Sequence, residues 1–311
     1  MKIFSLQLDD GGRVSGRVSL PPAAPGKGHR PLLVCFHGGS YDSEYFDATP
    51  EYSITQISDA LGIPVVSIDR PGYGDTTQPA IPQGETTTYA QVQGKYINEQ
   101  ILPRLWQEYG TQSEATAIVL LSHSIGAMMA TISAACCAGT TKYPLAGLIT
   151  SGIGAETNPI VAQQFKSIVT PGQEFMTFDP AIKDVSMLQL PHKQLADPAI
   201  TEFTANLNRP TPIGEFIDIN NTWLSYWKKY SQVIDVPLLY GISEFDELWT
   251  STPEIMEEYR DAFPSCPWIE SSIITQAPHC IELSYQRRGW QAKCCGFALE
   301  CATWYALTRR D

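Results

Sequence analysis

The sequence has little that would suit a nucleic-acid or membrane partner. It contains 21 Lys and Arg against 33 Asp and Glu, and no basic cluster offsets the resulting net charge of −12. Such a chain repels nucleic-acid phosphates and anionic membrane surfaces on average. No hydrophobic run approaches the roughly 18 residues that a membrane-spanning helix requires. We therefore expect neither nucleic acid nor membrane among the partners of this globular chain, of which 43% is hydrophobic and 17% charged.

Motifs for cofactors and metals are also missing. The glycine-rich stretch "DRPGYG" (69–74) lacks the Gly-x-Gly-x-x-Gly spacing of dinucleotide sites, and no Walker-type Gly-Lys-Ser occurs. No Cys-x-x-Cys pair is present, and the adjacent pairs Cys136–Cys137 and Cys294–Cys295 are poorly spaced for zinc. We expect no cofactor and no metal ion.

The eight cysteines indicate a reducing compartment. Several lie in apolar segments, which is typical of buried, reduced thiols in a cytoplasmic protein. The N-terminal stretch "MKIFSLQLDDGG" reaches acidic residues too soon to hold a secretory hydrophobic region. The expected location is therefore cytoplasmic, and the sequence leaves the oligomeric state open.

What the sequence does contain is an alternation of buried strands and helices. An antiparallel hairpin is expected around Asp10-Gly11-Gly12. Short, continuously apolar runs follow, and amphipathic segments with helical spacing separate them. This alternation predicts an α/β fold with a mostly parallel central sheet flanked by helices. The expected strands after the hairpin are 32–39, 63–74, 115–124, 144–152, 236–241 and 268–276, and the expected helices are 52–61, 86–110, 125–139, 253–262 and a last one around 290–304.

The alternation stops between residues 154 and 234. Four dipeptides there pair a helix N-cap residue with proline: Asn158–Pro159, Asp179–Pro180, Asp197–Pro198 and Thr211–Pro212. Each dipeptide also suits a plain turn, but four in succession favour a helical insertion over a loop. We expect an α/β core formed by residues 1–153 and 235–311, with a helical cap, or lid, of residues 154–234 inserted after the sixth strand.

The segment "SHSIG" (122–126) joins a buried strand to a helix. A strand–turn–helix elbow presents its central residue, here Ser124, to a cleft, and requires small residues two positions before and after it. Ser122 and Gly126 meet that requirement, although glycine is usual at the first of them. From these five residues alone, Ser124 could equally be the N-cap of the helix.

A serine nucleophile needs a base and an acid that orients the base. Of the five histidines, His279 follows the last expected strand and therefore lies at the strand edge where α/β sheets form their sites. Asp246 and Glu244 follow the preceding strand. Ser124, Asp246 and His279 thus lie at strand exits, in the chain order of one hydrolase architecture.

The turn after the first long buried strand offers donors for an oxyanion. Glycines in "HGGS" (37–40) allow backbone N–H groups to point into a cleft. The expected pair of donors is the N–H of Gly39 and that of Ile125, although a purely structural turn is the alternative.

Taken together, these motifs resemble the cap-bearing branch of the α/β-hydrolase superfamily. The similarity rests on "HGG", "DRPGYG", "SHSIG", "SEFDELW" (243–249) and "APHCIE" (277–282), which occur in the family's order. It implies Ser124 as nucleophile, His279 as base and Asp246 as acid. This acid loop departs from the family's commonest motif, which has glycine where Ser243 stands, so Glu244 remains the second candidate acid. Ser124 argues against epoxide hydrolases and dehalogenases of this fold, which need an aspartate there.

These residues predict a serine hydrolase that cleaves an ester, thioester or lactone of a small apolar or aromatic substrate. The same triad could serve acyl transfer, carbon–carbon bond cleavage or cyclisation in a biosynthetic, secondary-metabolite pathway. A binding module with an inactive triad is the alternative outside enzymes. The apolar substrate is suggested by aromatic residues of the insertion, most of which could instead only pack: Phe165, Phe175, Phe178, Phe203, Phe216, Trp223, Tyr226 and Trp227.

Overall fold

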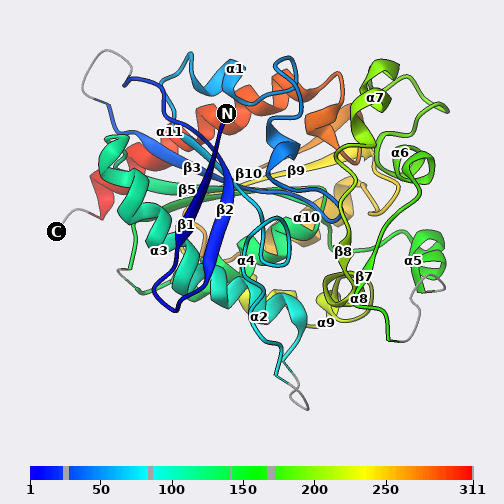
Figure 1. Cartoon of the computed structure of the whole chain (residues 1–311), viewed down its shortest axis with the longest axis horizontal. Helices are drawn as coiled ribbons and strands as arrows, with labels where there is room; N and C mark the ends of the chain where they lie inside the picture. The colour runs from blue at the N-terminus through cyan, green and yellow to red at the C-terminus, as the bar shows by residue number, and fades with distance from the viewer. Residues whose placement is uncertain (24–27, 83–86, 141, 167–171, 310–311) are drawn as a thin grey trace.

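An eight-stranded sheet forms the centre of the protein (Figure 1). The computed structural model describes residues 1–23, 28–82, 87–140, 142–166 and 172–309. The sheet has the order β1-β2-β4-β3-β5-β6-β9-β10. Its first two strands pair antiparallel, β2 pairs antiparallel with β4, and the remaining neighbours are parallel. The bounds are β1 Lys2–Gln7, β2 Arg13–Ser19, β3 Pro31–Phe36, β4 Val65–Ile68, β5 Ala117–His123, β6 Leu145–Ser151, β9 Leu238–Phe245 and β10 Ile269–Pro278.

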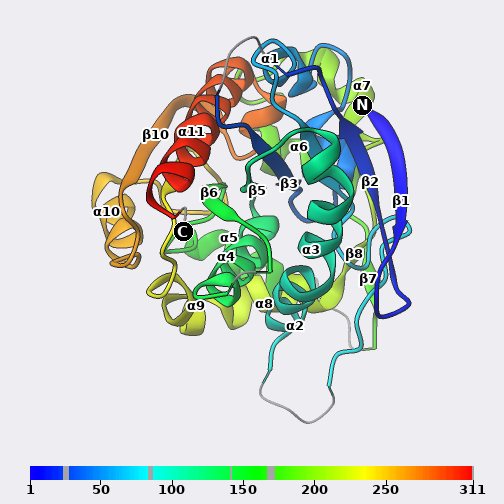
Figure 2. The ribbon, with the colours of Figure 1, turned by 90° about the vertical axis from the view of Figure 1, so that its left-hand side faces the viewer.

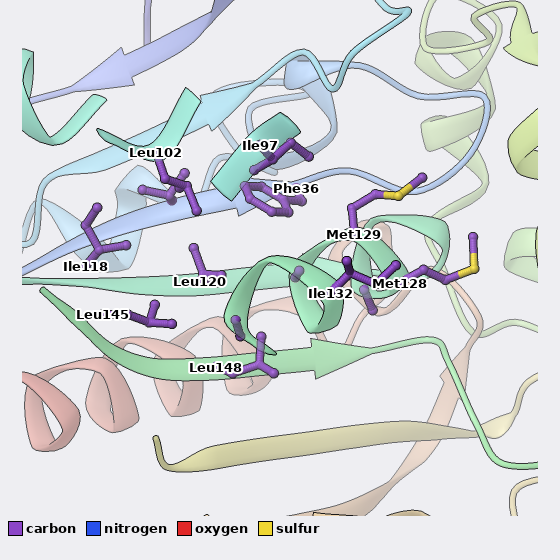
Figure 3. Close-up of a cluster of buried hydrophobic side chains, with 14 of the residues drawn as sticks. Phe36, Ile97, Leu102, Ile118, Leu120, Met128, Met129, Ile132, Leu145 and Leu148 are labelled. Carbon is purple, nitrogen blue, oxygen red and sulfur yellow. The ribbon is translucent and has the colours of Figure 1, made fainter. Parts of the chain in front are cut away.

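Both faces of the central strands are buried, so their residues alternate between two hydrophobic cores. In β5, Ile118 and Leu120 belong to one core, whereas Val119 and Leu121 belong to the other. This explains why the sequence of these strands is apolar at every position instead of every second one. Figure 3 shows part of the first core, in which side chains of one helix lie against those of β5 and β6: Leu120, Met128, Met129, Ile132, Leu145 and Leu148.

Helices cover the two faces of the sheet (Figure 2). On one face, the long helix α11 (Arg287–Thr308) packs on β3, β5 and β6, with the short α1 (Thr55–Ser58) beside it. On the other, α4 (Ile125–Cys137) lies against the same strands, and α2 (Tyr89–Tyr96) packs on α4. Helix α10 (Pro253–Asp261) contacts β10. The last expected helix is α11, and its residues spaced four and three apart face the sheet: Trp290, Cys294, Phe297 and Cys301 are buried, and Trp304 is half-buried.

Four expected elements differ most from the structure. The strand expected over 63–74 is limited to the four residues of β4. The helix expected at 52–61 shrinks to the four residues of α1, with turns on either side. The helix expected over 86–110 continues past Pro103 through two π-helical turns, Ile97–Ile101 and Trp106–Gly110, with α3 (Leu102–Leu105) between them. A wider turn accommodates a proline that can neither donate a hydrogen bond nor fit against the carbonyl four residues before it. Strand β9 extends four residues beyond the expected Gly241, to Phe245.

The segment between β6 and β9 is mostly helical and gathers at one end of the sheet, on the right in Figure 1. Three of the four cap–proline dipeptides begin helices, because Pro159, Pro180 and Pro198 are each the first helical residue. The fourth belongs to a strand, and its helix begins one residue later, at Ile213. The elements are α5 Pro159–Lys166, β7 Phe175–Met176, α6 Pro180–Leu188, α7 Thr201–Thr204, β8 Thr211–Pro212, α8 Ile213–Asn221 and α9 Trp223–Ser231, with a 3-10 turn at Pro198–Ile200.

All eight cysteines fall within the described residues, and each is a free thiol. Across the described part of the chain, no helix combines the length and apolar character that a membrane span requires.

Candidate active site

Ser124 occupies a strained elbow between β5 and α4. Its backbone has φ 53° and ψ −126°, outside the regions that an L-residue ordinarily adopts. Although Ser124 stands at the N-cap position of α4, its side chain caps no backbone N–H of that helix. Its own N–H donates to the carbonyl of Ser151 on β6 at 2.8 Å, which ties the elbow to the sheet. The N-cap role considered from the sequence is therefore not the one that this hydroxyl takes.

The residues two positions either side of Ser124 explain how the elbow packs. A Cβ atom on Gly126 would lie 2.4 Å from the His37 carbonyl oxygen and 2.5 Å from that of Phe36, so only glycine fits. Ser122, where glycine is usual, is buried and donates its hydroxyl to the Ile149 carbonyl at 2.8 Å. The small hydroxyl thus finds a partner in the neighbouring strand, and the departure from the usual motif is accommodated.

The structure brings Ser124, His279 and Asp246 together. His279 follows β10, and its Nε2 lies 3.0 Å from Ser124 Oγ. Its Nδ1 lies 2.8 Å from Oδ2 of Asp246, which follows β9. The other carboxylate oxygen of Asp246 accepts from the N–H groups of Leu248, at 2.9 Å, and Trp249, at 3.1 Å. The carboxylate is therefore held at both oxygens, and both it and the imidazole are buried.

Glu244, the second candidate acid, is placed elsewhere. It is exposed on the last part of β9, and its Oε2 accepts from the backbone N–H of Gln276 at 2.8 Å. Because β9 continues to Phe245, Glu244 remains in the strand, whereas Asp246 begins the loop that faces His279. The structure thus brings only one of the two carboxylates to the imidazole.

Gly39 and Ile125 lie next to each other beside Ser124. A Cβ on Gly39 would come within 2.7 Å of Ile125 Cδ1, so the turn and the start of α4 are in close approach. As the first residue of α4, Ile125 has an N–H without a partner in its own helix. Both residues line the same pocket as Ser124.

That pocket is mostly apolar and extends from Ser124 to the segment between β6 and β9. Its volume is about 650 Å³, including the space at its open mouth. Among the described residues that line it, polar groups come from Tyr41, Ser124, the histidines His123 and His279, Thr157, Thr211 and Asn220, and none carries a fixed charge. The main apolar contributions come from Ile125, Phe178, Met187, Phe216, Leu248 and Trp249.

The aromatic residues expected at the substrate divide into separate groups. Phe178 and Phe216 line the pocket and stand edge to face, with ring centroids 5.9 Å apart. Trp223 and Trp227 are buried in the core beside α4, and Tyr226 packs partly buried against it. Phe175 and Phe203 are exposed, and the side chain of Phe165 lies outside the described part of the structure. Of the eight, three therefore pack in or against the core, two line the pocket and two are exposed.

A model of the alpha/beta hydrolase family matches residues 33–286. The chain belongs to the alpha/beta hydrolase family. A search of curated proteins finds no significant match.

Solved structures of other α/β-hydrolases share the fold of this one. A soluble variant of monoglyceride lipase from Saccharomyces cerevisiae, in complex with a substrate analogue, is 16% identical, covers 97% of each chain and has a TM-score of 0.65. A thermostable carboxyl esterase from Bacillus coagulans is 15% identical over 97% of this chain and 98% of its own, with a TM-score of 0.65. A thioesterase domain from the curacin biosynthetic pathway is 16% identical over 96% and 99%, with a TM-score of 0.53. At these identities, the similarity concerns the fold.

Sequence reasoning missed a buried ion pair beside the His37–Ser40 turn of this α/β-hydrolase. Arg70 donates from Nε to the His37 carbonyl at 2.8 Å and from Nη2 to that of Gly38 at 3.1 Å. It also pairs with Glu215 on α8, with Nη1 2.6 Å from Oε2. Burial lowers the pKa of Arg70, but Glu215 and Tyr73 raise it further, so the net pKa lies above its ordinary value. Arg70 stands in the "DRPGYG" motif, but no local pattern indicates Glu215.

A second buried group, whose contacts no local pattern indicates, lies behind His279. His123 packs 4.8 Å from the His279 ring, between ring centroids, and its Nδ1 lies 3.0 Å from Ser151 Oγ. Nearby, the buried carboxylate of Glu282 accepts from Tyr45 Oη at 2.7 Å and from Trp290 Nε1 at 3.0 Å. Burial lowers the pKa of His123 well below its ordinary value and raises that of Glu282. The imidazole of His279 therefore packs against a neutral His123 ring.

The remaining histidines lie away from Ser124. His29 is half-buried in the loop before β3, and His192 is exposed after α6. Within the ranges that the structure describes, no three His, Cys, Asp or Glu side chains are grouped so that they could hold a metal ion.

Proposed function

We propose that this α/β-hydrolase is a serine hydrolase that acts on an ester, thioester or lactone. The observation that carries the proposal is the chain of contacts from Ser124 Oγ to His279 Nε2, at 3.0 Å, and from His279 Nδ1 to Asp246, at 2.8 Å. An alcohol becomes nucleophilic near neutral pH when an oriented imidazole can accept its proton. The fixed carboxylate of Asp246 would keep the hydrogen of the imidazole on Nδ1 and leave Nε2 free to accept.

In this mechanism, Ser124 Oγ bonds to the carbonyl carbon of the substrate while its proton passes to His279 Nε2. The N–H groups of Gly39 and Ile125 would stabilise the oxyanion. His279 then gives its proton to the leaving alkoxide or thiolate, and the acyl group remains on Ser124. A water molecule gives a proton to His279 and attacks the acyl carbon. The Ser124 oxygen leaves and regains a proton from His279, which releases the acid.

We further propose that residues 154–234 act as a cap over the core of residues 1–153 and 235–311. Phe178, Met187 and Phe216 of this segment line the pocket together with Ser124 and His279 of the core. The uncharged and mainly apolar lining supports a small-molecule substrate with a neutral aliphatic or aromatic acyl group. The eight free thiols support a reducing, cytoplasmic location.

The nucleophile is tested with a fluorophosphonate probe and mapping of the adduct by mass spectrometry. We expect one covalent adduct on Ser124 in the wild-type protein, and neither adduct nor hydrolysis of p-nitrophenyl butyrate in Ser124→Ala. A wild-type protein that carries no adduct on Ser124 would show that the proposal is wrong.

The acid is tested by a matched pair of substitutions. Asp246→Asn removes the charge that orients His279, and we expect kcat to fall by about 10⁴-fold. Glu244→Gln changes an exposed carboxylate two residues earlier, at the end of β9, and we expect kcat to stay within about twofold of wild type. Equal losses in the two variants would contradict the assignment of Asp246.

A further inference from the structure

We propose that Glu215 of α8 is a positioning residue, which acts through Arg70 and Tyr73 to hold the Gly39 N–H where the oxyanion forms. The inference rests on the proposed serine hydrolase function. It assigns part of the oxyanion site to the segment between β6 and β9, although the turn itself belongs to the core.

The turn around Gly39 is held at its carbonyl groups by two basic side chains. Arg70 binds the carbonyls of His37 and Gly38. Lys183 of α6 donates to the Ser40 carbonyl at 2.8 Å. The Gly38 carbonyl and the Gly39 N–H belong to one planar peptide group, so the bond from Arg70 to that carbonyl sets the direction of the N–H.

His37 makes the attachment of Arg70 firmer. The backbone N–H of Arg70 donates to His37 Nε2 at 3.1 Å, so this nitrogen must be an acceptor. The ring hydrogen is therefore on Nδ1, which donates to the Gly38 carbonyl at 2.7 Å. Burial and the neighbouring Arg70 lower the pKa of His37 well below its ordinary value, which keeps the ring in this neutral form.

Glu215 holds two of the groups that contact this turn, Arg70 and Tyr73. Its carboxylate binds Arg70 in bidentate geometry, with Nη1 2.6 Å from Oε2 and Nη2 3.1 Å from Oε1. Tyr73 donates its hydroxyl to the same Oε1 and accepts from the Ser40 N–H at 3.3 Å. Arg70 and Glu215 are both buried, so moving Arg70 out of the plane of the carboxylate would leave a buried charge without its partner, at a high cost in free energy.

Helix α8 also contacts the pocket directly. Phe216, Ile219 and Asn220, one, four and five residues after Glu215, line it together with Ser124. The helix that would touch the acyl group is thus the helix that orients the proposed oxyanion turn. Helix α8 therefore couples binding of the acyl group in the pocket to the position of the Gly39 N–H.

An ion pair that only docks one segment on another would have a different effect, and the chain offers such a pair as a control. The Arg209 side chain contacts Asp42 and Glu44 of the core, and therefore joins the same two parts of the molecule. The Arg209 side chain makes no hydrogen bond to the His37–Ser40 turn, because only its backbone N–H donates to the Ser40 carbonyl. Arg209→Ala removes the docking contact and keeps that backbone bond.

The test compares Glu215→Gln and Arg209→Ala with wild type in the hydrolysis of p-nitrophenyl butyrate. Inhibition by an alkyl trifluoromethyl ketone, which forms an oxyanion on Ser124, is measured beside inhibition by the corresponding alcohol, which does not. For Glu215→Gln we expect kcat to fall and the ketone inhibition constant to rise by about tenfold or more, with KM and the alcohol constant within about twofold. This effect is smaller than the fall in kcat of about a hundredfold or more that follows complete removal of one oxyanion donor, because Glu215→Gln only displaces the donor. Arg209→Ala should change none of these values by more than about twofold.

Tyr73→Phe decides the question if Glu215→Gln does not fold, because it removes one hydroxyl and leaves the ion pair intact. We expect it to raise the ketone constant by about threefold to tenfold, with the alcohol constant unchanged. Ketone constants that match wild type in every folded variant would overturn the inference while the Ser124 adduct remained. Absence of that adduct in wild type would instead overturn the proposed function.

Discussion

At the scale of single residues, the backbone of Ser124 is the feature that the surroundings must support. A conformation of this kind costs about 1–3 kcal/mol and persists only where neighbouring contacts hold it. Two contacts hold the conformation of Ser124. Its N–H donates to the Ser151 carbonyl, and Gly126 packs closely against the carbonyls of Phe36 and His37. The strained backbone of Ser124 therefore requires glycine at position 126, where even the methyl group of alanine would be too large.

Gly126→Ala tests this dependence. The added carbon would meet two backbone oxygens that cannot move far, so we expect the free energy of unfolding to fall by about 1–3 kcal/mol and labelling of Ser124 to slow. Gly296 of α11 is the matched control, because nothing lies within 4 Å of the position of its Cβ. Gly296→Ala should stabilise the helix by up to about 1 kcal/mol. Urea unfolding measures both, and a loss of stability no larger in Gly126→Ala than in the control would contradict the packing described.

The sequence located the three residues that the structure brings into contact, but it did not identify what holds them. Ser124, Asp246 and His279 follow strands, and the ends of parallel strands meet at one edge of a sheet. Glu215 gave no such signal, because its partner Arg70 is 145 positions away and acidic residues are common on helices. The same holds for Glu282, whose partners come from separate elements.

At the scale of secondary structure, local patterns predicted where elements begin better than where they end. Pro159, Pro180 and Pro198 begin helices because proline lacks an N–H that the first turn would leave unpaired. The end of β9 could not be predicted, because Ser243 and Glu244 look like a loop and yet belong to the strand, in which Ser243 pairs with Ile274 of β10. That difference of four residues decided between Glu244 and Asp246.

Helix α6 carries a lysine that makes stability depend on pH. Lys183 is buried, lies over the ring of Tyr41 and has a pKa lowered by burial from 10.5 to about 7, despite the nearby Cys280, Asp184 and Asp42. Above pH 7 the folded protein holds Lys183 neutral, whereas the unfolded chain still binds the proton up to about pH 10.5. The unfolded state binds more protons in this window, so this group increases stability as the pH rises and removes that contribution as the pH falls through 7.

Lys183→Met removes the titration and keeps a long side chain. We expect the unfolding free energy of wild type, relative to this variant, to rise between pH 7 and 10 by up to about 1.4 kcal/mol per pH unit. Chemical denaturation at several pH values measures the difference, in which groups that titrate alike in both proteins cancel. A difference that stays constant across this range would show that the pKa of Lys183 is not lowered.

At the scale of the whole molecule, the two cores share the strands that separate them. Because neighbouring residues of β5 face opposite cores, loss of packing on either side weakens the same sheet. This arrangement was readable in the sequence, since strands buried on both faces appear as unbroken apolar runs. The path of the segment between β6 and β9 was not, since its position depends on distant contacts such as those of Lys183 and Arg209.

Substitutions on the two faces of β5 should therefore act alike. We expect Leu120→Ala and Leu121→Ala each to lower the unfolding free energy by about 2–5 kcal/mol, with the denaturant midpoint shifted in the same direction. Leu307→Ala on α11, where the side chain is 75% exposed, should change it by less than about 0.5 kcal/mol. If one of the two β5 variants unfolded at the wild-type midpoint, the cores would not be coupled through the sheet.

The free thiols have a practical consequence for experiments on this protein. Burial raises the pKa of each of the eight cysteines, so few thiolates are present to react while the chain stays folded. Only Cys136 and Cys266 are partly accessible. Reaction of the other six with Ellman's reagent must wait for an opening of the structure, so its rate measures how often each region opens, with no added label.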